Sequence, residues 1–399
     1  MKKIYLDYAA TTPVDKAVAK AMAPFLSEKF GNASSLHSFG REAKVAIETS
    51  RATLAKFINA KPNEIIFTSS DTESNNFALK GIVVRKAEGP QAGGPEDRSD
   101  ERTTEVKKHG HVILSAIEHD STMEIADSLK QWATQFSYIP VNNNGVVNPA
   151  DIKNAIRENT ILVSVIFASN ELGTLQPIEE ISKICRDKGI LFHTDASQAF
   201  GKVAIDVQKM NIDLLSASAH KMYGPKGAAF LYVRTGVSIE PLLHGGGQEF
   251  GQRGSTVNVP AIVGFAKAAE VSYKIMEREN KRLEKLRKKL ISEVLKIEGA
   301  HLSADPEKRV PHIINFWFEG INGEMLTTHL DLKGIACSTG SACSSIHLEA
   351  SHILQAIGLT KEQAQGSLRI SLGRKTTEEE IRYFVKVLRD IVGKLKKNL

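Results

Sequence analysis

Residues 161–196, "ILVSVIFASNELGTLQPIEEISKICRDKGILFHTDA", decide the fold that this chain is predicted to adopt. Apolar, β-branched runs at 161–167 and 190–196 have the composition of buried strands. Between them, "PIEEISKICRDKG" begins with Pro, ends with Gly and repeats apolar residues at helical spacing. A strand, a helix and a second strand in this order predict a βαβ unit with parallel strands.

The same alternation extends from about residue 60 to residue 235 and predicts an α/β domain with a mostly parallel sheet. Further strands are expected at 64–69, 111–117, 213–219 and 228–233, and a helix in "TESNNFALKGIVVRKA". Ligands of such sheets bind beyond the carboxyl ends of the strands. The polar residues that follow these strands are therefore the first candidates for a functional site.

A second block of sequence follows this domain. It contains a charged amphipathic helix at about 268–298, the strand-like runs "HIINFWF" and "SLRISLG", and a closing helix from Thr376. Because 399 residues exceed what one hydrophobic core usually organises, we expect two domains with a boundary near residue 265. The expected limits are 15–265 for the large domain, and 1–14 together with 266–399 for the small one.

The composition, 42% hydrophobic and 25% charged, is typical of a globular protein. The sequence has no run of about eighteen apolar residues, and its N-terminus turns polar too soon for a signal peptide, so we expect a cytoplasmic protein without membrane contact. The lysines behind the net charge of +6 sit at helical spacing and indicate a solvated face rather than a nucleic-acid site. Residues 87–110, rich in Gly, Pro and charge, are expected to be a mobile surface insertion.

The stretch "SASAHKMYGPKG", residues 216–227, places Lys221 just after an apolar strand. Burial disfavours a lysine cation unless the side chain has a charged partner or a covalent role, such as a Schiff base. A surface lysine in a Gly-Pro turn would explain this stretch equally well. Other parts of the sequence have to decide between the two interpretations.

A pyridoxal phosphate on Lys221 needs an acid for its pyridine nitrogen, a phosphate site and a flat group against its ring. Taken one at a time, each residue that could meet one of these needs could instead have a purely structural role, as a helix cap or as a hydrogen-bonded group at the end of a strand. Their joint placement after strands of one α/β domain favours a cofactor site. The candidates are Asp195 for the nitrogen, Gln198 for the ring oxygen, Asp71 and Thr72 at a helix start for the phosphate, and His119 for stacking.

A metal site is the alternative for some of these side chains. His193 and Asp195 share one face of a strand, and His119 and His220 could join them. The sequence has neither "HExxH" nor a close cysteine pair. We therefore expect no intrinsic metal.

The chain resembles the NifS/IscS-type cysteine desulfurases, class V aminotransferases of the fold-type I group of pyridoxal phosphate enzymes. The resemblance rests on "YLDYAATTPVD", "FGNASSLHSFGREA", "TESNN", "NELGTLQPIEEI", "HTDASQA", "SAHKMYGPKG", "GGGQE", "STGSACSS" and "LRISLGR". It spans nearly the whole chain apart from residues 87–110. It implies an α/β fold with a mostly parallel seven-stranded sheet in the large domain, a smaller α+β C-terminal domain, and a homodimer with shared active sites.

The resemblance also implies a role for each matching residue. Lys221 would carry the cofactor, Asp195 would pair with its ring nitrogen, and His119 would stack on the ring and move protons. The remaining roles are Gln198 and Asn170 at the ring oxygen, Asn170 and Arg369 at the substrate carboxylate, Ser218, His220 and the backbone of Asp71 and Thr72 at the phosphate, Thr256 at the phosphate of the neighbouring subunit, and Cys343 as nucleophile.

The implied reaction leaves the sulfur of L-cysteine on Cys343 as a persulfide and releases alanine. The sulfur would pass to an iron–sulfur scaffold protein or to tRNA thiolation, and Cys343 could ligate a transferred cluster. A selenocysteine lyase or class V transaminase, and a sulfur carrier without turnover, are the alternatives. Of the other thiols, Cys337 is expected to be a small packed residue near a strand end and Cys185 a core residue.

The sequence departs from the family pattern at a few positions. Members commonly read "GATE" where this chain has "SDTE", so Asp71 brings a carboxylate beside the expected phosphate. Either its side chain turns away while its backbone binds, or phosphate affinity is reduced. Ser169 replaces an Asn, and "RGST" at 253–256 replaces "RSGT", but neither change removes a catalytic group.

Overall fold

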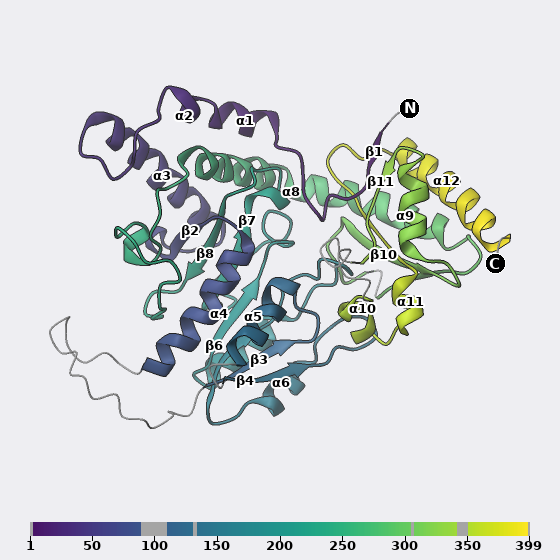
Figure 1. The fold of residues 1–399 in the computed structure, drawn as a ribbon, viewed down its shortest axis with the longest axis horizontal. Helices are drawn as coiled ribbons and strands as arrows, with labels where there is room; N and C mark the ends of the chain where they lie inside the picture. Colours follow the sequence, from purple (N-terminus) through teal and green to yellow (C-terminus); the bar gives the residue numbers. More distant parts are fainter. Residues whose placement is uncertain (1–2, 89–109, 131–133, 305–306, 341–349, 398–399) are drawn as a thin grey trace.

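The computed structural model describes residues 3–88, 110–130, 134–304, 307–340 and 350–397. Cys343 and nearly all of the predicted insertion 87–110 lie outside these ranges. The described residues form a large α/β unit and a smaller C-terminal unit (Figure 1). None of the helices in these ranges has the length and apolar character needed to cross a membrane.

The large unit is built on a seven-stranded sheet in the order β2-β8-β7-β6-β5-β3-β4. Its strands from β4 to β7 pair in parallel, and β8 is antiparallel to both of its neighbours. This confirms the mostly parallel sheet. The strands are β2 Ile65–Thr68, β3 His111–Ser115, β4 Gln135–Ile139, β5 Thr160–Ser164, β6 Leu191–Asp195, β7 Leu214–Ser218 and β8 Ala229–Val233.

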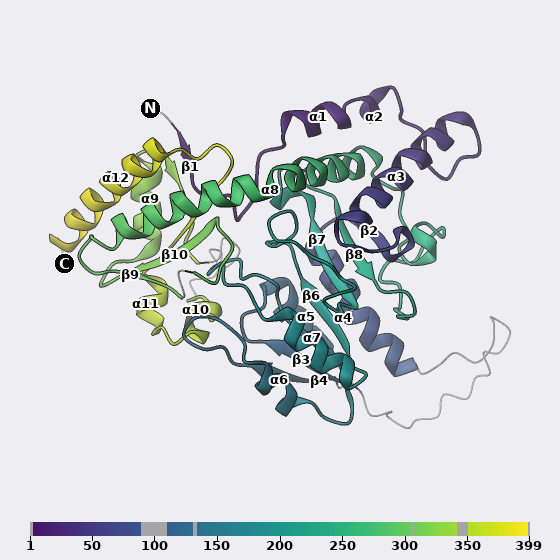
Figure 2. The same cartoon turned by 180° about the vertical axis from the view of Figure 1, so that it is seen from behind.

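Helices cover both faces of this sheet (Figures 1 and 2). In β3, Ile113 packs into the core on one face, with α3, α7 and α8, while Val112 and Leu114 pack into the core with α4 and α5. This alternation follows from the two-residue period of a strand. The helices of this unit are α1 Lys16–Met22, α2 Pro24–Ser27, α3 Ser38–Phe57, η1 Pro62–Glu64, α4 Asp71–Glu88, α5 Asp120–Lys130, α6 Pro149–Ala155, α7 Ile178–Asp187, η2 Ala219–Lys221, η3 Glu249–Gly251 and the start of α8 Val259–Val294.

The C-terminal unit has a three-stranded antiparallel sheet in the order β12-β10-β9, and a parallel pair formed by β1 and β11. Because Ile4 of β1 pairs with Ile335 of β11, the N-terminal strand belongs to this sheet system rather than to the large sheet. The elements are β1 Ile4–Tyr5, β9 Ala300–Leu302, β10 Ile313–Phe318, α9 Gly323–Asp331, β11 Ile335–Ala336, α10 His352–Ala356, α11 Lys361–Gln365, β12 Ser367–Ser371 and α12 Glu378–Lys397.

Helix α8 connects the two units without a break. Its first half buries Phe265 in the core of the large sheet, and its second half buries Leu290 in the C-terminal core. The helix begins at Val259 rather than near residue 268, because the Asn258 side chain accepts a hydrogen bond from the Ala261 N–H and caps its first turn. The domain limits near residues 14 and 265 stay predictions.

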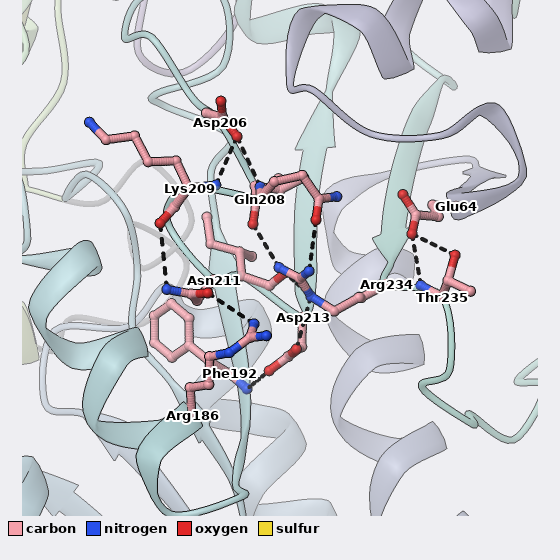
Figure 3. A network of polar contacts seen from close by, with 12 residues as sticks. Glu64, Arg186, Phe192, Asp206, Gln208, Lys209, Asn211, Asp213, Arg234 and Thr235 are labelled. Carbon is pink, nitrogen blue, oxygen red and sulfur yellow. Dashed lines mark hydrogen bonds and ion pairs between the residues drawn. The ribbon is translucent and has the colours of Figure 1, made fainter.

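A polar network closes the edge of the large sheet where β6 and β7 begin (Figure 3). Arg234 donates to the carbonyls of Val207 and Ile212 at 2.7 and 2.9 Å, and its Nε lies 3.2 Å from Asp213. The other oxygen of Asp213 accepts from the Phe192 N–H at 2.9 Å. These side chains satisfy one another and the backbone, so we assign this edge a structural role.

The second half of α8 provides a test of the C-terminal core. Replacing the fully buried Leu290 with Ala is expected to lower the free energy of unfolding by about 2–5 kcal/mol, because it removes apolar contacts and leaves a cavity. Leu295→Ala, at the end of the same helix where the side chain is 45% exposed, is the matched control and should cost much less. Chemical denaturation followed by circular dichroism measures both. Equal losses would contradict this packing.

Candidate active site

A cavity of about 250 Å³ lies beyond the carboxyl ends of β2, β5, β6 and β7. These strands end in parallel at one edge of the sheet, so the polar residues that follow them meet there. Most of the residues selected from the sequence line this cavity, namely Asp71, Thr72, His119, Asn170, Asp195, Gln198, His220, Lys221 and Arg369.

The carboxylate of Asp195 is buried at the end of β6 and is held by two donors. The Ser197 N–H donates to Oδ1 at 2.9 Å, and the Asn75 amide donates to Oδ2, also at 2.9 Å. Asn75 comes from α4 and is itself fully buried. The two bonds fix the carboxylate while leaving lone pairs directed at the cavity.

His119 lies at the start of α5 and lines the same cavity. Its Nδ1 accepts from the N–H and the hydroxyl of Ser121 at 3.0 and 2.9 Å. Burial lowers the pKa of His119, with Asp195 opposing the shift. The ring is therefore neutral at pH 7, with its proton on Nε2.

Lys221 reaches into the cavity from η2, which directly follows β7. Its Nζ donates to the carbonyls of Ala9 and Ala10 at 2.8 and 2.9 Å. The Gln198 amide donates to the same Ala9 carbonyl at 3.0 Å. The segment after β1 therefore provides the acceptors that hold the ammonium group.

Arg369, in β12, brings the C-terminal unit to the cavity. Its guanidinium donates to the carbonyls of Asn170 and Gly340 at 3.1 and 3.2 Å, and lies 3.1 Å from the carboxylate of Asp7. Among the described residues, its Nε has no partner, and neither does the side-chain oxygen of Asn170, although both atoms are buried. Buried polar groups without partners are rare and indicate a missing ligand or water.

Asp71 directs its carboxyl group into the site from the first residue of α4. Oδ2 accepts from the Ser218 hydroxyl at 2.6 Å, Oδ1 is buried, and the Ser197 hydroxyl also faces this carboxyl group and lowers its pKa. Of the two orientations left open by the sequence, the side chain takes the one that faces the cavity. Ser218, predicted to bind phosphate, is therefore already bonded to Asp71, and His220 Nδ1 lies 3.1 Å from the Thr11 hydroxyl.

Two further predicted site residues are not part of this cavity in the described structure. Thr256 is exposed and does not belong to the residues that line this cavity. Cys343 lies outside the described residues. Of the other thiols, Cys337 packs against the C-terminal core and Cys185 is fully buried, and burial raises the pKa of each to about 12.

Sequence reasoning missed several residues that support the site. Asn75 could have been found from the "SNN" after Asp71, but the Ala9 and Ala10 carbonyls carry no side-chain signal. Glu118 was also missed. Its Oε1 accepts from the Ser115 hydroxyl and the Ile166 N–H at 2.5 and 2.6 Å, and burial raises its pKa to about 8. It braces the turn that carries His119.

His193, weighed above as a metal ligand, is bonded on both ring nitrogens. Nδ1 lies 2.8 Å from the Ser164 hydroxyl and Nε2 lies 3.1 Å from the Ser216 hydroxyl. In the ranges that the structure describes, no group of three or more His, Cys, Asp or Glu side chains is placed to hold a metal. Both nitrogens of His193 thus have partners within the sheet.

The chain is similar to known proteins over nearly its whole length. The profile of the family described as aminotransferase class-V matches residues 4–91 and 99–384. A protein named cysteine desulfurase IscS from Dictyoglomus turgidum is 46% identical over 396 residues, 99% of this chain and 96% of its own length. Another of that name from Methanosarcina thermophila is 46% identical over 395 residues, covering 99% of this chain and 93% of its own.

Solved structures are also similar. One titled "NIFS-LIKE PROTEIN" has a TM-score of 0.88 at 38% identity and covers 98% of this chain and 100% of its own. One titled "SspA in complex with cysteine" has a TM-score of 0.77 at 36% identity and covers 93% of this chain and 99% of its own. The stretch 92–98, which the family profile leaves unmatched, falls within the predicted insertion 87–110.

The hydrogen bonds of His119 predict its protonation state. At pH 7, ring ¹⁵N shifts should show a neutral imidazole protonated on Nε2, because burial lowers its pKa and the Ser121 N–H occupies Nδ1. Ser121→Ala, which keeps the backbone N–H, should leave this tautomer unchanged, and His119→Gln identifies the signals. A cationic ring, or a proton on Nδ1, would show that the assignment is wrong.

Proposed function

The chain belongs to the aminotransferase class-V family, and we propose that it is a cysteine desulfurase that removes the sulfur of L-cysteine and releases L-alanine. Relatives of that name, 44–47% identical over nearly the whole chain, support this activity. The observation that carries the proposal is the convergence of Lys221, Asp195 and His119 on one cavity. A cytoplasmic location is part of the proposal.

The residues of the cavity fit pyridoxal phosphate. A fixed carboxylate, a neutral imidazole and an amine face one space, and the buried side-chain oxygen of Asn170 is free to accept a hydrogen bond from a ligand. When bound, the cofactor serves as an electron sink that makes the α-carbon of an attached amino acid acidic. Asp195 would hold it at the ring nitrogen, His119 at the ring face and Gln198 at the ring oxygen.

Lys221 would carry the cofactor and move a proton at the substrate α-carbon through its Nζ. For this, Nζ has to leave the carbonyls of Ala9 and Ala10, which hold it as an ammonium donor. The neutral His119 ring lines the same cavity and would exchange a second proton through Nε2.

Arg369 and Asn170 would bind the carboxylate of the substrate. The guanidinium is oriented by Asp7 at 3.1 Å and keeps a buried Nε without a partner in the described part of the chain. A carboxylate would satisfy this donor with a charge-assisted bond. The neighbour titled as a complex with cysteine supports an amino acid of this size as substrate.

Cys343 would take the sulfur of the substrate as a persulfide. The Cys343 thiolate would attack the substrate sulfur and form a sulfur–sulfur bond. The carbon–sulfur bond would break at the same time, and the electron pair of this broken bond would stay with the carbon fragment that becomes alanine. Cys337 fits this role less well, because burial raises its pKa to about 12 and a thiol, unlike a thiolate, is a poor nucleophile. The sulfur would then pass to an iron–sulfur scaffold protein or a tRNA-thiolation acceptor.

A homodimer with shared active sites completes the proposal. Leu36 is 90% exposed, and Leu26, Phe30 and Phe39, which are near it in sequence, are also exposed, with the two phenylalanine rings 5.7 Å apart. Large exposed apolar patches are rare on monomers. These residues lie at the outer edge of the large unit, around α2 and the start of α3 (Figure 1). We assign this patch to a second copy of the chain.

The loop before Thr256 supports a role across that interface. It is fixed by the buried pair of Arg51 and Glu249, 2.7 Å apart, and by Arg253, which lies 2.7 Å from Glu73 in the first turn of α4. Thr256 is exposed at the end of this fixed loop. It would reach the phosphate in the active site of the partner.

Two cysteines that lie close in sequence test the proposed nucleophile. Cys343→Ala should lower alanine release from cysteine on the order of a thousandfold and abolish the trapped persulfide, because the attacking thiolate is gone. Cys337→Ala is the matched control and should retain both. Lys221→Ala should lose the visible absorbance band of the cofactor. A persulfide mapped to Cys337 would reverse the assignment, and wild-type protein without a cofactor band would refute the proposed function.

The exposed patch predicts an effect on assembly. Leu36→Glu should shift the protein from dimer towards monomer in sedimentation equilibrium, because a charge cannot be buried unpaired in an apolar interface. Leu332→Glu, at an exposed leucine of the C-terminal unit, is the control and should leave the dimer intact. A monomeric wild type, or an unchanged dimer in Leu36→Glu, would contradict this interface.

A further inference from the structure

The carboxyl group of Asp71 lies where the cofactor phosphate is expected. Asp71 is the first residue of α4, and it lines the cavity together with Thr72, His220 and Lys221. Its Oδ2 accepts from the Ser218 hydroxyl at 2.6 Å, its Oδ1 is buried, and the Ser197 hydroxyl faces the same carboxyl group and lowers its pKa. A buried acceptor therefore points into the site, with the Ser197 and Ser218 hydroxyls beside it.

A phosphate at this position would share the Ser218 hydroxyl with Asp71. The N–H groups in the first turn of a helix have no partner within the helix, and with the helix dipole they attract an anion. The Ser218 hydroxyl, the side-chain donor expected for the phosphate, already bonds to Asp71. The two anions would thus lie at one helix end and compete for one hydroxyl, that of Ser218.

The surroundings of Asp71 hold charges of both signs. The carboxylate of Asp195 faces it from the end of β6, the ammonium of Lys221 faces it from η2, and Lys202 adds a second amine from the loop after β6. Burial, followed by the charge of Asp195, raises the pKa of Asp71 to about 6. The carboxyl group therefore changes its charge close to neutral pH.

We propose that Asp71 makes cofactor binding proton-linked: the phosphate is bound when Asp71 is protonated and donates to it, and ionised Asp71 competes with it for the end of α4 and Ser218. This inference rests on the proposed function, because it concerns the phosphate of pyridoxal phosphate. It names a residue that sets cofactor affinity and that the reaction itself does not use.

The direction of the pH effect follows from linkage. Below pH 6 Asp71 is already protonated, so binding takes up no proton there. Above pH 6 binding has to protonate Asp71, and the apparent Kd rises about tenfold for each pH unit until the pKa of the complex is reached. Between pH 6 and pH 8 the Kd should thus rise by up to about fifty-fold.

The test compares wild type with Asp71→Asn, whose amide keeps the shape and mimics the protonated acid. The full-length chain, stripped of cofactor, is titrated with pyridoxine 5′-phosphate by equilibrium dialysis, since this probe lacks the aldehyde that reacts with Lys221. The phosphate ionises identically in both titrations, so its effect cancels in the ratio of the two Kd values. Asp71→Ala is a second variant that also removes the carboxyl group.

The ratio of the wild-type Kd to the Asp71→Asn Kd should be about two at pH 6, where Asp71 is half ionised, and rise about fifty-fold towards about one hundred at pH 8. Pyridoxine without phosphate should give a ratio near one at every pH. A ratio that stays constant with pH, or tighter binding by the wild type at pH 8, would overturn the proposal while leaving the proposed function intact. If neither protein binds the phosphate probe, the cofactor site itself is wrong and both proposals fall.

Discussion

The buried carboxylate of Asp195 is the constraint on which the site depends. A buried carboxylate is costly without donors, and here the Ser197 N–H and the Asn75 amide provide them. Asn75 ties the carboxylate to α4, so the end of β6 and the start of that helix are fixed relative to each other. The same negative charge acts on its neighbours, because it opposes the fall in the pKa of His119 and adds to the rise in that of Asp71.

The apolar patterns predicted the strands that lie inside the sheet, because a strand covered on both faces reads as a continuous apolar run. They missed β4, an edge strand in which only Ile139 is buried, and they missed β1 and β11, which are only two residues long. The start of α8 was misplaced because its opening turn is specified by the cap at Asn258. The periodicity of apolar residues reveals an element that buries one face. A helix cap or a two-residue strand depends instead on contacts with other parts of the chain, which the periodicity does not record.

Some residues of the site could be predicted from the sequence, and others could not. Asp195, His119 and Lys221 could be selected because each follows an apolar run and carries a side chain suited to the chemistry. The Ala9 and Ala10 carbonyls could not be predicted, because every residue has a backbone carbonyl and the residue type does not show which ones accept a hydrogen bond from Lys221. Asp71 is an intermediate case. The sequence shows that a carboxylate lies beside the expected phosphate, but only the hydrogen bond from Ser218 in the structure shows which way its side chain points. For Thr256 and Cys343, the sequence supplies the roles through resemblance alone.

The first residues of the chain are in contact with almost the last. Asp7 pairs with Arg369, 362 positions away, and the Ala9 N–H donates to Ser371 at 2.8 Å. During translation, the segment that holds Lys221 therefore emerges first but finds its partners last. Such distant contacts also slow folding, because a long loop has to close before they form. A chain that ends before β12 would lack the Arg369 and Ser371 partners of this segment, so the carbonyls that hold Lys221 are anchored only once the C-terminal unit has formed.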